Sequence, residues 1–456
     1  MRVSLARVGD WLRDHARAIR AVQWVLVLVY GFLLLVPVFL PLPDDSARIL
    51  NNLTLFAQFV FWGIWWPFVL LSMVLFGRLW CGMLCPEGSL TEWTSRHGLG
   101  RAIPRWMRWN GWPVVGFAST TLYGQLVSVY QYPKAAMLVL GGSTLAAIAV
   151  GLVYTRGKRA WCRHLCPVTG VFALLGKLAP MHYRVDETRW LESAKNRRIT
   201  IAVDCAPLMP LRHMKGNSGC HMCARCSGYR DAISLSARSP AQEVVELGAV
   251  EATAWQTVLI LYGLLGIAIG AFHWTASPWF IAVKQACADW LAARDIVWPL
   301  ENNAPWWLLT HYPQVNDTFT WLDGGMIVAY ILATSLLLGS TLSLCLAVAV
   351  RSGGRWHWQR FHHLAQSLIP QAGIGVFLGL STLTVSLLKA EGLHLWWVSG
   401  ARLGLLLLAN VWSLWLARGI VRGWTPDRAR QSGALVAVAL ALLAVDGAWA
   451  LLFWYW

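Results

Sequence analysis

Charged residues are scarce in this chain of 456 residues, at 13% of the total, whereas soluble domains carry about 25%. Hydrophobic residues make up 57% of the chain, and the mean hydropathy is +0.50. This composition excludes an intrinsically disordered chain, a secreted disulfide scaffold and a simple cytosolic enzyme. It predicts an integral membrane protein with several spans.

Acidic residues are the scarcer of the two charged classes, with 22 Asp and Glu against 38 Lys and Arg. Basic residues of membrane proteins gather on the cytoplasmic side, so the excess indicates topology and does not point to nucleic acid as a partner. A signal-peptide pattern is also lacking, because residues 1–20 are basic and amphipathic, with no short apolar run before a cleavage site. We expect this segment to lie on the inner membrane surface or to be solvated.

Apolar stretches of about 20 residues, the length that spans a bilayer, occur nine times. The weakest stretch is 112–131, which contains several polar residues. The fold class is therefore an all-α polytopic membrane protein with about nine transmembrane helices. The predicted spans are 21–41, 53–77, 112–131, 135–155, 252–272, 325–350, 364–388, 395–417 and 433–456.

The distribution of basic residues sets the orientation of these spans. With a cytoplasmic N-terminus, 32 of the 38 Lys and Arg lie in the inner segments 1–20, 78–111, 156–251, 351–363 and 418–432. This predicts a multi-pass protein of the bacterial inner membrane whose C-terminus faces outward. The long outer insertion 273–324 is rich in Trp and is expected to rest on the lipid interface; a docking platform for a partner is the alternative.

Two helical hairpins within residues 21–170 end in the same motif. The first reads Arg-Leu-Trp-Cys81-Gly-Met-Leu-Cys85-Pro, and the second reads Arg-Ala-Trp-Cys162-Arg-His-Leu-Cys166-Pro. Arg, Trp, Leu, Pro and both Cys match in register at an offset of 81 residues. A match of this kind predicts an internal repeat.

A third cysteine group follows in the cytoplasmic segment 171–251, where Cys205 precedes Cys220, Cys223 and Cys226. Bacterial ferredoxins bind a 4Fe–4S cluster through Cys-x2-Cys-x2-Cys-x3-Cys-Pro, in which the last Cys serves the other cluster. This chain contains the two halves of that pattern separately, with Arg230 where the fourth Cys would stand. The segment is therefore expected to be a small ferredoxin-like Fe–S segment.

Eight cysteines are enough to hold two 4Fe–4S clusters. The predicted cluster and metal ligands are Cys81, Cys85, Cys162, Cys166, Cys205, Cys220, Cys223 and Cys226. Structural zinc is the alternative, because zinc also uses four-cysteine sites, whereas disulfides do not suit the reducing cytosol. The remaining Cys287 and Cys345 are interpreted as structural.

The spacing leaves two ways to divide the ligands. In the shared arrangement, Cys220, Cys223, Cys226 and one Cys-Pro cysteine hold one cluster, as in ferredoxins. In the simpler arrangement, the two Cys-x3-Cys-Pro pairs hold one cluster. The other cluster is held by Cys205, Cys220, Cys223 and Cys226. The spacing favours the shared arrangement.

Paired hairpins ending in Arg-x-Trp-Cys-x3-Cys-Pro, followed by a ferredoxin-like segment, resemble the NapH/NosR family of membrane Fe–S proteins over about residues 20–235. The resemblance implies electron transfer in the inner membrane between the quinol pool and respiratory partner subunits, with the chain as the quinol dehydrogenase component. The chain departs from the family in having one incomplete ferredoxin run and no flavin-attachment sequence. The resemblance does not explain the five C-terminal spans within residues 252–456.

A quinone site needs a proton acceptor and hydrogen-bond partners at the membrane edge. Arg360, His362 and His363 form such a group on the inner face, and His273, Asp317, Asp323, Glu391 and His394 form one on the outer face. Each group is also explained as an ordinary interfacial anchor or solvated loop. Haem is disfavoured because no His stands in the middle of a span, and the attachment motif Cys-x-x-Cys-His is lacking.

Two other functions remain open. A redox-sensing or maturation factor for a periplasmic metalloenzyme would also need clusters, although a sensor does not need two. A transporter with structural clusters would be expected to carry ionisable residues at the midplane, where Asp446 is an exception among mostly uncharged spans. The eight-ligand count favours electron transfer.

Overall fold

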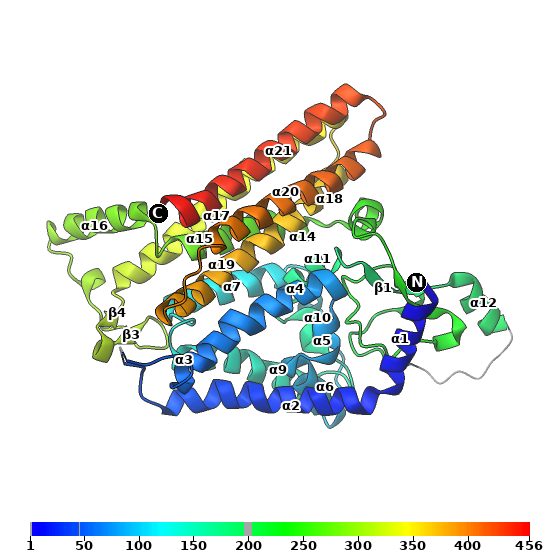
Figure 1. The fold of residues 1–456 in the computed structure, drawn as a ribbon, viewed down its shortest axis with the longest axis horizontal. Helices are drawn as coiled ribbons and strands as arrows, with labels where there is room; N and C mark the ends of the chain where they lie inside the picture. The colour runs from blue at the N-terminus through cyan, green and yellow to red at the C-terminus, as the bar shows by residue number, and fades with distance from the viewer. Residues whose placement is uncertain (1, 45, 196–202) are drawn as a thin grey trace. The chain divides into compact units, whose positions relative to one another are not determined.

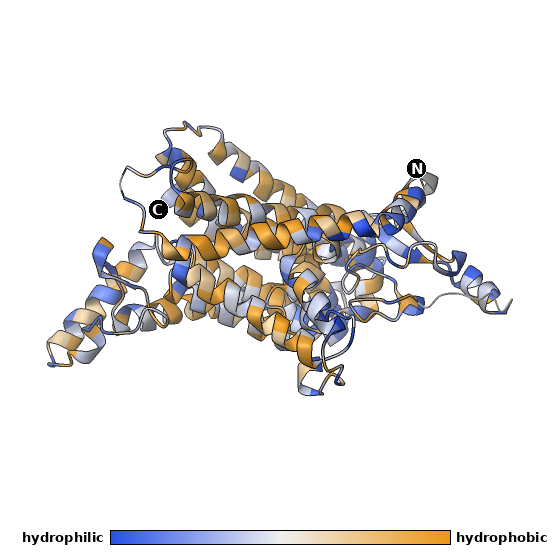
Figure 2. Cartoon of the chain, turned by 90° about the horizontal axis from the view of Figure 1, so that it is seen from below, coloured by the Kyte–Doolittle hydropathy of each residue, from blue (hydrophilic) through white to orange (hydrophobic). Residues whose placement is uncertain are grey.

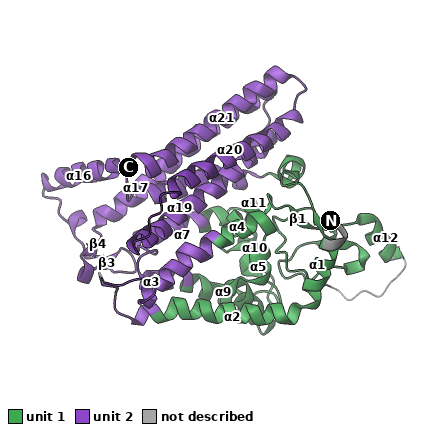
Figure 3. Cartoon of the chain, in the orientation of Figure 1, with its two compact units in different colours: residues 1–36, 68–116, 141–252 green, residues 37–67, 117–140, 253–456 purple. Residues whose placement is uncertain are grey.

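The computed structural model describes residues 2–44, 46–195 and 203–456, and the chain folds into two compact units (Figure 3). Unit 1 contains residues 1–36, 68–116 and 141–252. Unit 2 contains residues 37–67, 117–140 and 253–456. All eight predicted ligand cysteines lie in unit 1, and the predicted boundary near residue 252 coincides with the last boundary between the units.

Eight helices among the described residues are long and apolar enough to cross a membrane. Figure 2 shows that the long helices are hydrophobic along most of their length. The chain is therefore a mostly helical multi-pass membrane protein, as its composition predicted. These helices are Ala16–Phe39, Leu53–Phe76, Pro133–Val153, Ala254–His273, Trp321–Gly353, Trp358–Ala390, Val398–Arg422 and Arg428–Tyr455.

The ninth predicted span, 112–131, is shorter than expected. Its helix α7 runs from Trp112 to Leu126, which is 15 residues, or about 22 Å against the roughly 30 Å of a hydrocarbon core. Arg159 nevertheless contacts the backbone of Cys81, so the two cysteine motifs lie on one side of the membrane. The chain must therefore cross the membrane an even number of times between the two motifs. This supports α7 as a membrane-crossing helix that pairs with the following span, Pro133–Val153.

Unit 1 places both cysteine motifs at the ends of packed helices (Figure 1). Helix α6 packs against α2 and α9, and the short helices α5 and α10 precede α6 and α11. The helices of this unit are α1 (Arg2–Asp14), α2 (Ala16–Leu35), α4 (Trp66–Phe76, mostly in this unit), α5 (Leu79–Met83), α6 (Pro86–Arg96), α9 (Gly142–Val153), α10 (Ala160–His164), α11 (Thr169–Gly176), α12 (Glu187–Lys195) and α13 (Gly248–Glu251).

Two strands bracket the third cysteine group. Strand β1 (Met181–Val185) pairs antiparallel with β2 (Ile233–Ala237), in the register Met181↔Ala237 to Val185↔Ile233. Because Cys205 and the group Cys220–Cys226 lie between the strands in sequence, the ladder closes this loop at its base. Tyr183, Ile233 and Leu235 from the ladder form one buried core with Cys220 and Cys226.

The N-terminal helix α1 packs on β2. Leu5 and Leu12 contact the core that contains Cys220 and Cys226. Arg13 Nη1 donates to the carbonyl oxygen of Ser227 at 2.6 Å. One face of α1 therefore packs on the cysteine segment, whereas Val8 and Trp11 on this helix remain exposed.

Unit 2 is built mainly from long helices. Helix α17 packs against α21, and α20 lies between α19 and α21 (Figure 1). Its elements are α3 (Leu53–Gln58), α7 (mostly), α8 (Pro133–Ala136), α14 (Ala254–Val258), α15 (Ala268–His273), α16 (Pro278–Ala292), β3 (His311–Tyr312), β4 (Asp317–Thr318), α17 (Trp321–Gly353), α18 (Trp358–Ala365), α19 (Ile369–Ala390), α20 (Val398–Arg422) and α21 (Arg428–Ala450). In the outer insertion, five Trp side chains are exposed, as interfacial anchors would be: Trp279, Trp290, Trp298, Trp306 and Trp307.

Candidate iron–sulfur site

The two Cys-x3-Cys-Pro motifs have the same local structure. In each repeat the first cysteine lies in a helix of five residues, α5 or α10. The N–H of the second cysteine donates to the carbonyl oxygen of the repeat's tryptophan, at 2.9 Å in the first repeat and 3.0 Å in the second. A new helix, α6 or α11, starts within three residues after each second cysteine. The two motifs therefore share one local backbone geometry, which supports the predicted internal repeat.

The arginine of each repeat reaches across to the cysteine of the other. Arg159 Nη1 donates to the carbonyl oxygen of Cys81. Arg78 Nη2 donates to Thr169 Oγ1 at 2.9 Å, and this hydroxyl donates to the carbonyl oxygen of Cys162 at 2.8 Å. Both arginines are buried, with 3% and 1% of their surface exposed for Arg78 and Arg159. These contacts fix the two motifs against each other.

One of the positions at which the two halves differ is Gly88, which corresponds to Thr169. A Cβ atom at Gly88 would lie 3.2 Å from Arg159 Nη1 and 3.2 Å from the carbonyl oxygen of Cys81. The missing side chain leaves room for the direct arginine contact in one half, whereas the threonine hydroxyl mediates it in the other.

The third cysteine group forms a tight loop. Met222 and Ala224, between its cysteines, have positive φ angles of 52° and 61°. The N–H of Met222 donates to Cys220 Sγ at 3.4 Å, and hydrogen bonds to cluster sulfurs are one of the factors that set cluster potentials. This backbone geometry supports the prediction that Cys220, Cys223 and Cys226 wrap around one cofactor.

A buried carboxylate fixes the backbone of the residues that precede this loop. Glu243, which is fully buried, accepts hydrogen bonds from the N–H groups of Asn217 at 2.8 Å and Ser218 at 3.2 Å. It also pairs with Arg238 at 2.5 Å. Since a buried charge needs both a counter-charge and hydrogen bonds, the arrangement fixes the chain just before Cys220.

The first motif and the third group touch at Gly82. A Cβ atom built on Gly82 would lie 1.9 Å from the carbonyl oxygen of His221 and 3.0 Å from the nitrogen of Cys223. Glycine is therefore required between Cys81 and Met83, because the backbone of the third group occupies the place of a side chain. This contact sets the two cysteine groups directly beside each other.

Glu92 links the three cysteine segments through arginines. Its carboxylate, 5% exposed, accepts from Arg159 Nε at 2.9 Å, from Arg225 Nη2 at 2.6 Å and from Arg96 Nη2 at 2.7 Å. Burial alone would raise the pKa of Glu92, but the guanidinium groups of Arg159 and Arg225 outweigh it and lower the pKa to about 2. Glu92 is therefore ionised at neutral pH. No local pattern indicates this role, because Arg159 and Arg225 come from distant segments of the chain.

The thiols of the two hairpin motifs influence one another. Burial raises the pKa of Cys85 well above its usual value, and the thiols of Cys162 and Cys81 add to the effect. Burial likewise raises the pKa of Cys166, with further contributions from Glu87, Cys162 and Cys85. These four cysteines form the first quartet: Cys81, Cys85, Cys162 and Cys166.

The other four cysteines interact in the same way. Burial raises the pKa of Cys220 to about 12, against the hydrogen bond from the Met222 N–H, and Cys223 and Cys205 contribute to the rise. Burial raises the pKa of Cys226, with contributions from Cys220, Cys223 and Cys205. The second quartet is therefore Cys205, Cys220, Cys223 and Cys226. This grouping matches the simpler division of ligands, and the shared arrangement stays the alternative prediction.

The surroundings of the quartets suit an anionic cluster. A 4Fe–4S cluster with four thiolates carries negative charge, and nearby cations stabilise its reduced form. Arg78, Arg159 and Arg225 supply positive charge at the backbone or edge of both quartets. Counted over the described residues, no group of three or more His, Cys, Asp or Glu side chains could hold a single metal ion. Cubane ligands lie farther apart, since each binds a different iron atom.

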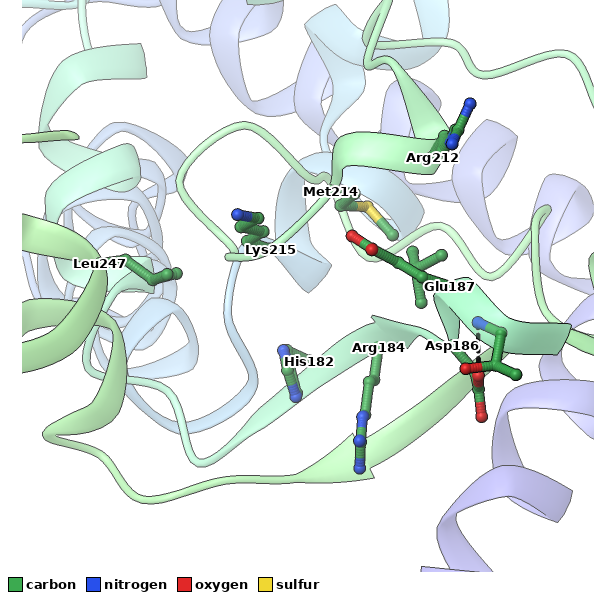
Figure 4. Close-up of a pocket in the computed structure, with 10 residues that line it drawn as sticks. His182, Arg184, Asp186, Glu187, Arg212, Met214, Lys215 and Leu247 are labelled. Carbon is green, nitrogen blue, oxygen red and sulfur yellow. Dashed lines mark hydrogen bonds between the residues drawn. The ribbon is translucent and has the colours of Figure 1, made fainter. Parts of the chain in front are cut away.

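A pocket of about 500 Å³ lies beside the second quartet (Figure 4). Met214 lines the pocket and also belongs to the core that contains Cys220 and Cys226. The titratable residues of the lining include both acidic and basic side chains: His182, Arg184, Asp186, Glu187, Arg212 and Lys215. Burial, together with Arg238, lowers the pKa of His182 to about 4, so this side chain is neutral at pH 7.

The inner-face quinone candidates lie on α18 in unit 2, and Arg360 and His362 have different neighbours. His362 Nδ1 is 3.0 Å from Thr257 Oγ1. The Arg360 guanidinium lies 5.6 Å from the centre of the Trp424 ring, and His363 is buried.

Cys287 and Cys345 lie in unit 2, whereas the eight ligand candidates lie in unit 1.

Comparison with known proteins supports the iron–sulfur interpretation. Residues 58–108 and 138–185, which contain both Cys-x3-Cys-Pro motifs, match the family described as a 4Fe-4S binding domain. No solved structure matches the chain.

Curated relatives include the putative electron transport protein YccM of Escherichia coli, 24% identical over 229 residues, which are 44% of this chain and 62% of YccM. The methylamine utilization ferredoxin-type protein MauN of Methylorubrum extorquens is 30% identical, over 24% of this chain and 42% of MauN. MauN of Paracoccus denitrificans is 28% identical, over 24% of this chain and 43% of that protein. Each match spans less than two thirds of the relative. The chain thus carries a 4Fe–4S binding domain and is homologous to ferredoxin-type electron transport proteins.

Proposed function

We propose that the chain is an inner-membrane electron-transfer protein that holds two 4Fe–4S clusters and passes electrons between the quinol pool and a respiratory partner, in the manner of the NapH/NosR family. The observation that carries the proposal is the pair of cysteine quartets, which touch at Gly82. A bound 4Fe–4S cluster supplies one-electron redox chemistry. The first quartet would hold one cluster and the second quartet the other.

The residues around the quartets have separate tasks in this proposal. The buried Arg78 and Arg159 hold the two hairpin motifs together and offset the negative charge of the cofactors. Glu92 orients Arg159 and Arg225 and limits the excess of positive charge. Gly82 lets the two quartets approach each other, and a short separation favours electron transfer between them.

The cofactor content gives the first test. Anaerobically purified protein is expected to contain about eight iron atoms and eight acid-labile sulfides, as two cubanes require. Cys162→Ser should remove the first cluster and Cys223→Ser the second, each leaving about half of the iron. Cys287→Ser, outside both quartets, is the matched control and should keep all of it. Stoichiometric zinc without sulfide would refute the proposal.

Ligand division is tested with the same variants. Electron paramagnetic resonance of the dithionite-reduced Cys166→Ser variant should show the signal of the second cluster unchanged. In the shared arrangement, either Cys166→Ser or the corresponding Cys85→Ser variant would instead alter the cluster that contains Cys220. The two outcomes therefore separate the two divisions of ligands.

The side of the membrane is tested with reporter fusions. The excess of basic residues in the inner segments supports a cytoplasmic position for both quartets. Fusions after residues 95 and 230 should read as cytoplasmic, and a fusion after residue 300 as external. A fusion after residue 230 that reads as external would contradict the orientation.

Exchange with quinol is tested by stopped-flow mixing. Anaerobic addition of a short-chain quinol should bleach the iron–sulfur absorbance of the oxidised protein in a saturable way. His362→Ala should slow this reaction if α18 forms the quinone site, whereas His394→Ala tests the outer face in the same assay. If quinol does not reduce the clusters and quinone does not oxidise them, the quinol pool is not a partner of this protein.

A further inference from the structure

Asp446 is an acidic side chain near the middle of the C-terminal helices, and the electron-transfer proposal gives it no task. It lies on α21, and each of its carboxylate oxygens accepts a hydrogen bond from a different neighbouring helix. Gln371 Nε2 on α19 donates to Oδ1 at 2.7 Å, and Asn410 Nδ2 on α20 donates to Oδ2 at 2.6 Å. The three residues join α19, α20 and α21 through one carboxyl group.

This group lies at the middle of the long helix α20. Asn410 is the middle residue of α20, which runs from Val398 to Arg422, with 12 residues on either side. At a rise of 1.5 Å per residue, about 18 Å of helix separates it from each end. A carboxylate at such a depth is costly, and ionisable residues inside membranes mark ion or proton sites by default.

The charge of Asp446 is not balanced by a cation. Among the described residues, no Lys, Arg or His nitrogen lies within 4 Å of its carboxylate. The titratable or charged side chains on the packed helices lie elsewhere along them: Asp323, Tyr330, Cys345 and Arg351 on α17, Lys389 on α19, Arg402, Arg418 and Arg422 on α20, and Arg428 and Arg430 on α21. His273 on α15 contacts the ring of Trp449, one helical turn beyond Asp446.

The amide neighbours can serve a carboxyl group in both protonation states. The Gln371 and Asn410 oxygens are buried and have no hydrogen-bond partner within the described part of the chain. Turning either amide by 180° exchanges its N–H for its oxygen, which then accepts a hydrogen bond from a protonated Asp446. Gln371 is fully buried, so this unsatisfied oxygen is costly unless a proton donor occupies the site at times.

We propose that Asp446, with Gln371 and Asn410, forms a proton-binding site near the middle of the membrane, at which the carboxyl group takes up and releases a proton. Uptake forms one O–H bond on Asp446 and turns one amide, and release reverses both changes. The helix surface beside Asp446 is open, with Leu443 63% exposed. The site is therefore within reach of lipid-soluble molecules. It involves no cysteine ligand, so its test is independent of the clusters.

The site is tested with dicyclohexylcarbodiimide, a lipid-soluble reagent that modifies protonated carboxyl groups. The full-length protein in lipid vesicles is treated at pH values from about 5 to about 9, and modified residues are located by mass spectrometry. Asp446 should be modified at low pH, and its labelling should fall about tenfold per pH unit once the carboxyl ionises. Asp323 is the matched control, because it is ion-paired with Lys284 at 2.9 Å near a helix end and should not react.

A second measurement keeps the proposal falsifiable if labelling is sterically blocked. The infrared band of a protonated carboxylic acid should appear at low pH, disappear at high pH and be missing from Asp446→Asn. That variant keeps the shape and both helix contacts, so it should fold and retain its iron. A band that persists unchanged from about pH 5 to about pH 9, or no band at any pH, would show a purely structural carboxyl and overturn the proposal.

Discussion

Replacing Glu92 by Gln tests the arginine network that joins the cysteine segments. The substitution keeps the shape of the side chain but removes the charge that holds Arg159, Arg225 and Arg96. The pKa of Glu92 falls from an ordinary 4.5 to about 2 in the folded protein. A tenfold change in an acid constant corresponds to about 1.4 kcal/mol, so ionised Glu92 stabilises the fold by about 3 kcal/mol.

The sign of the pH dependence follows from the direction of this change. Because the folded pKa is depressed, the stabilisation is complete above about pH 4.5 and is lost as the pH falls toward about 2. Glu92→Gln should therefore lower the free energy of unfolding by about 3 kcal/mol at pH 7, and it should flatten the loss of stability below about pH 5. Denaturant titration in detergent, followed by tryptophan fluorescence, measures both effects.

The same substitution should raise the reduction potential of bound clusters, because it removes a negative charge near them. A unit charge at about 10 Å, with an effective dielectric constant of about 20, contributes about 1.7 kcal/mol, or about 70 mV for one electron. Redox titration followed by electron paramagnetic resonance measures the shift. Glu246→Gln, at an exposed position of the same unit, is the control. Unchanged stability and potentials in Glu92→Gln, as in the control, would refute the reasoning.

Three further substitutions or treatments test the rest of the site. Gly82→Ala should disrupt both clusters, because the new Cβ would lie 1.9 Å from the carbonyl oxygen of His221, and iron content measures the loss. Glu243→Gln leaves the buried Arg238 unpaired, which should cost about 3–5 kcal/mol and selectively loosen the second quartet, as seen in the loss of its resonance signal. Anaerobic removal of iron with a chelator should make the eight ligand thiols reactive to alkylation, whereas Cys287 should react equally before and after the treatment.

The features that depend on local sequence could be predicted. Span positions follow from runs of apolar residues, and eight of the nine predicted spans are long helices. The repeat follows from matched motifs, and the 4Fe–4S binding domain follows from cysteine spacing. The short helix α7 departs from the expected span because its polar residues and the early end at Leu126 shorten it.

The features that depend on distant contacts could not be predicted. Glu92 is an ordinary acidic residue in its own segment, and only folding brings Arg159 and Arg225 to it. The docking of α1 on β2 was missed because a basic amphipathic helix fits a membrane surface equally well. The division of ligands was guided by ferredoxins, in which one continuous run serves two clusters. Here the Cys-x3-Cys-Pro pairs belong to two hairpins whose motifs contact each other, so the sequence spacing alone does not decide between the two divisions.

The reciprocal arginines have a consequence for the order in which the protein is made. Because Arg159 binds the backbone at Cys81 and Arg78 reaches Cys162 through Thr169, neither hairpin completes its own motif. The ribosome must synthesise Cys166 before the first quartet exists, and Cys226 before the second. At that moment the helices from Ala254 onward have not yet entered the membrane. Because all eight predicted ligands are synthesised before these spans, assembly of the clusters does not have to wait for the C-terminal helices.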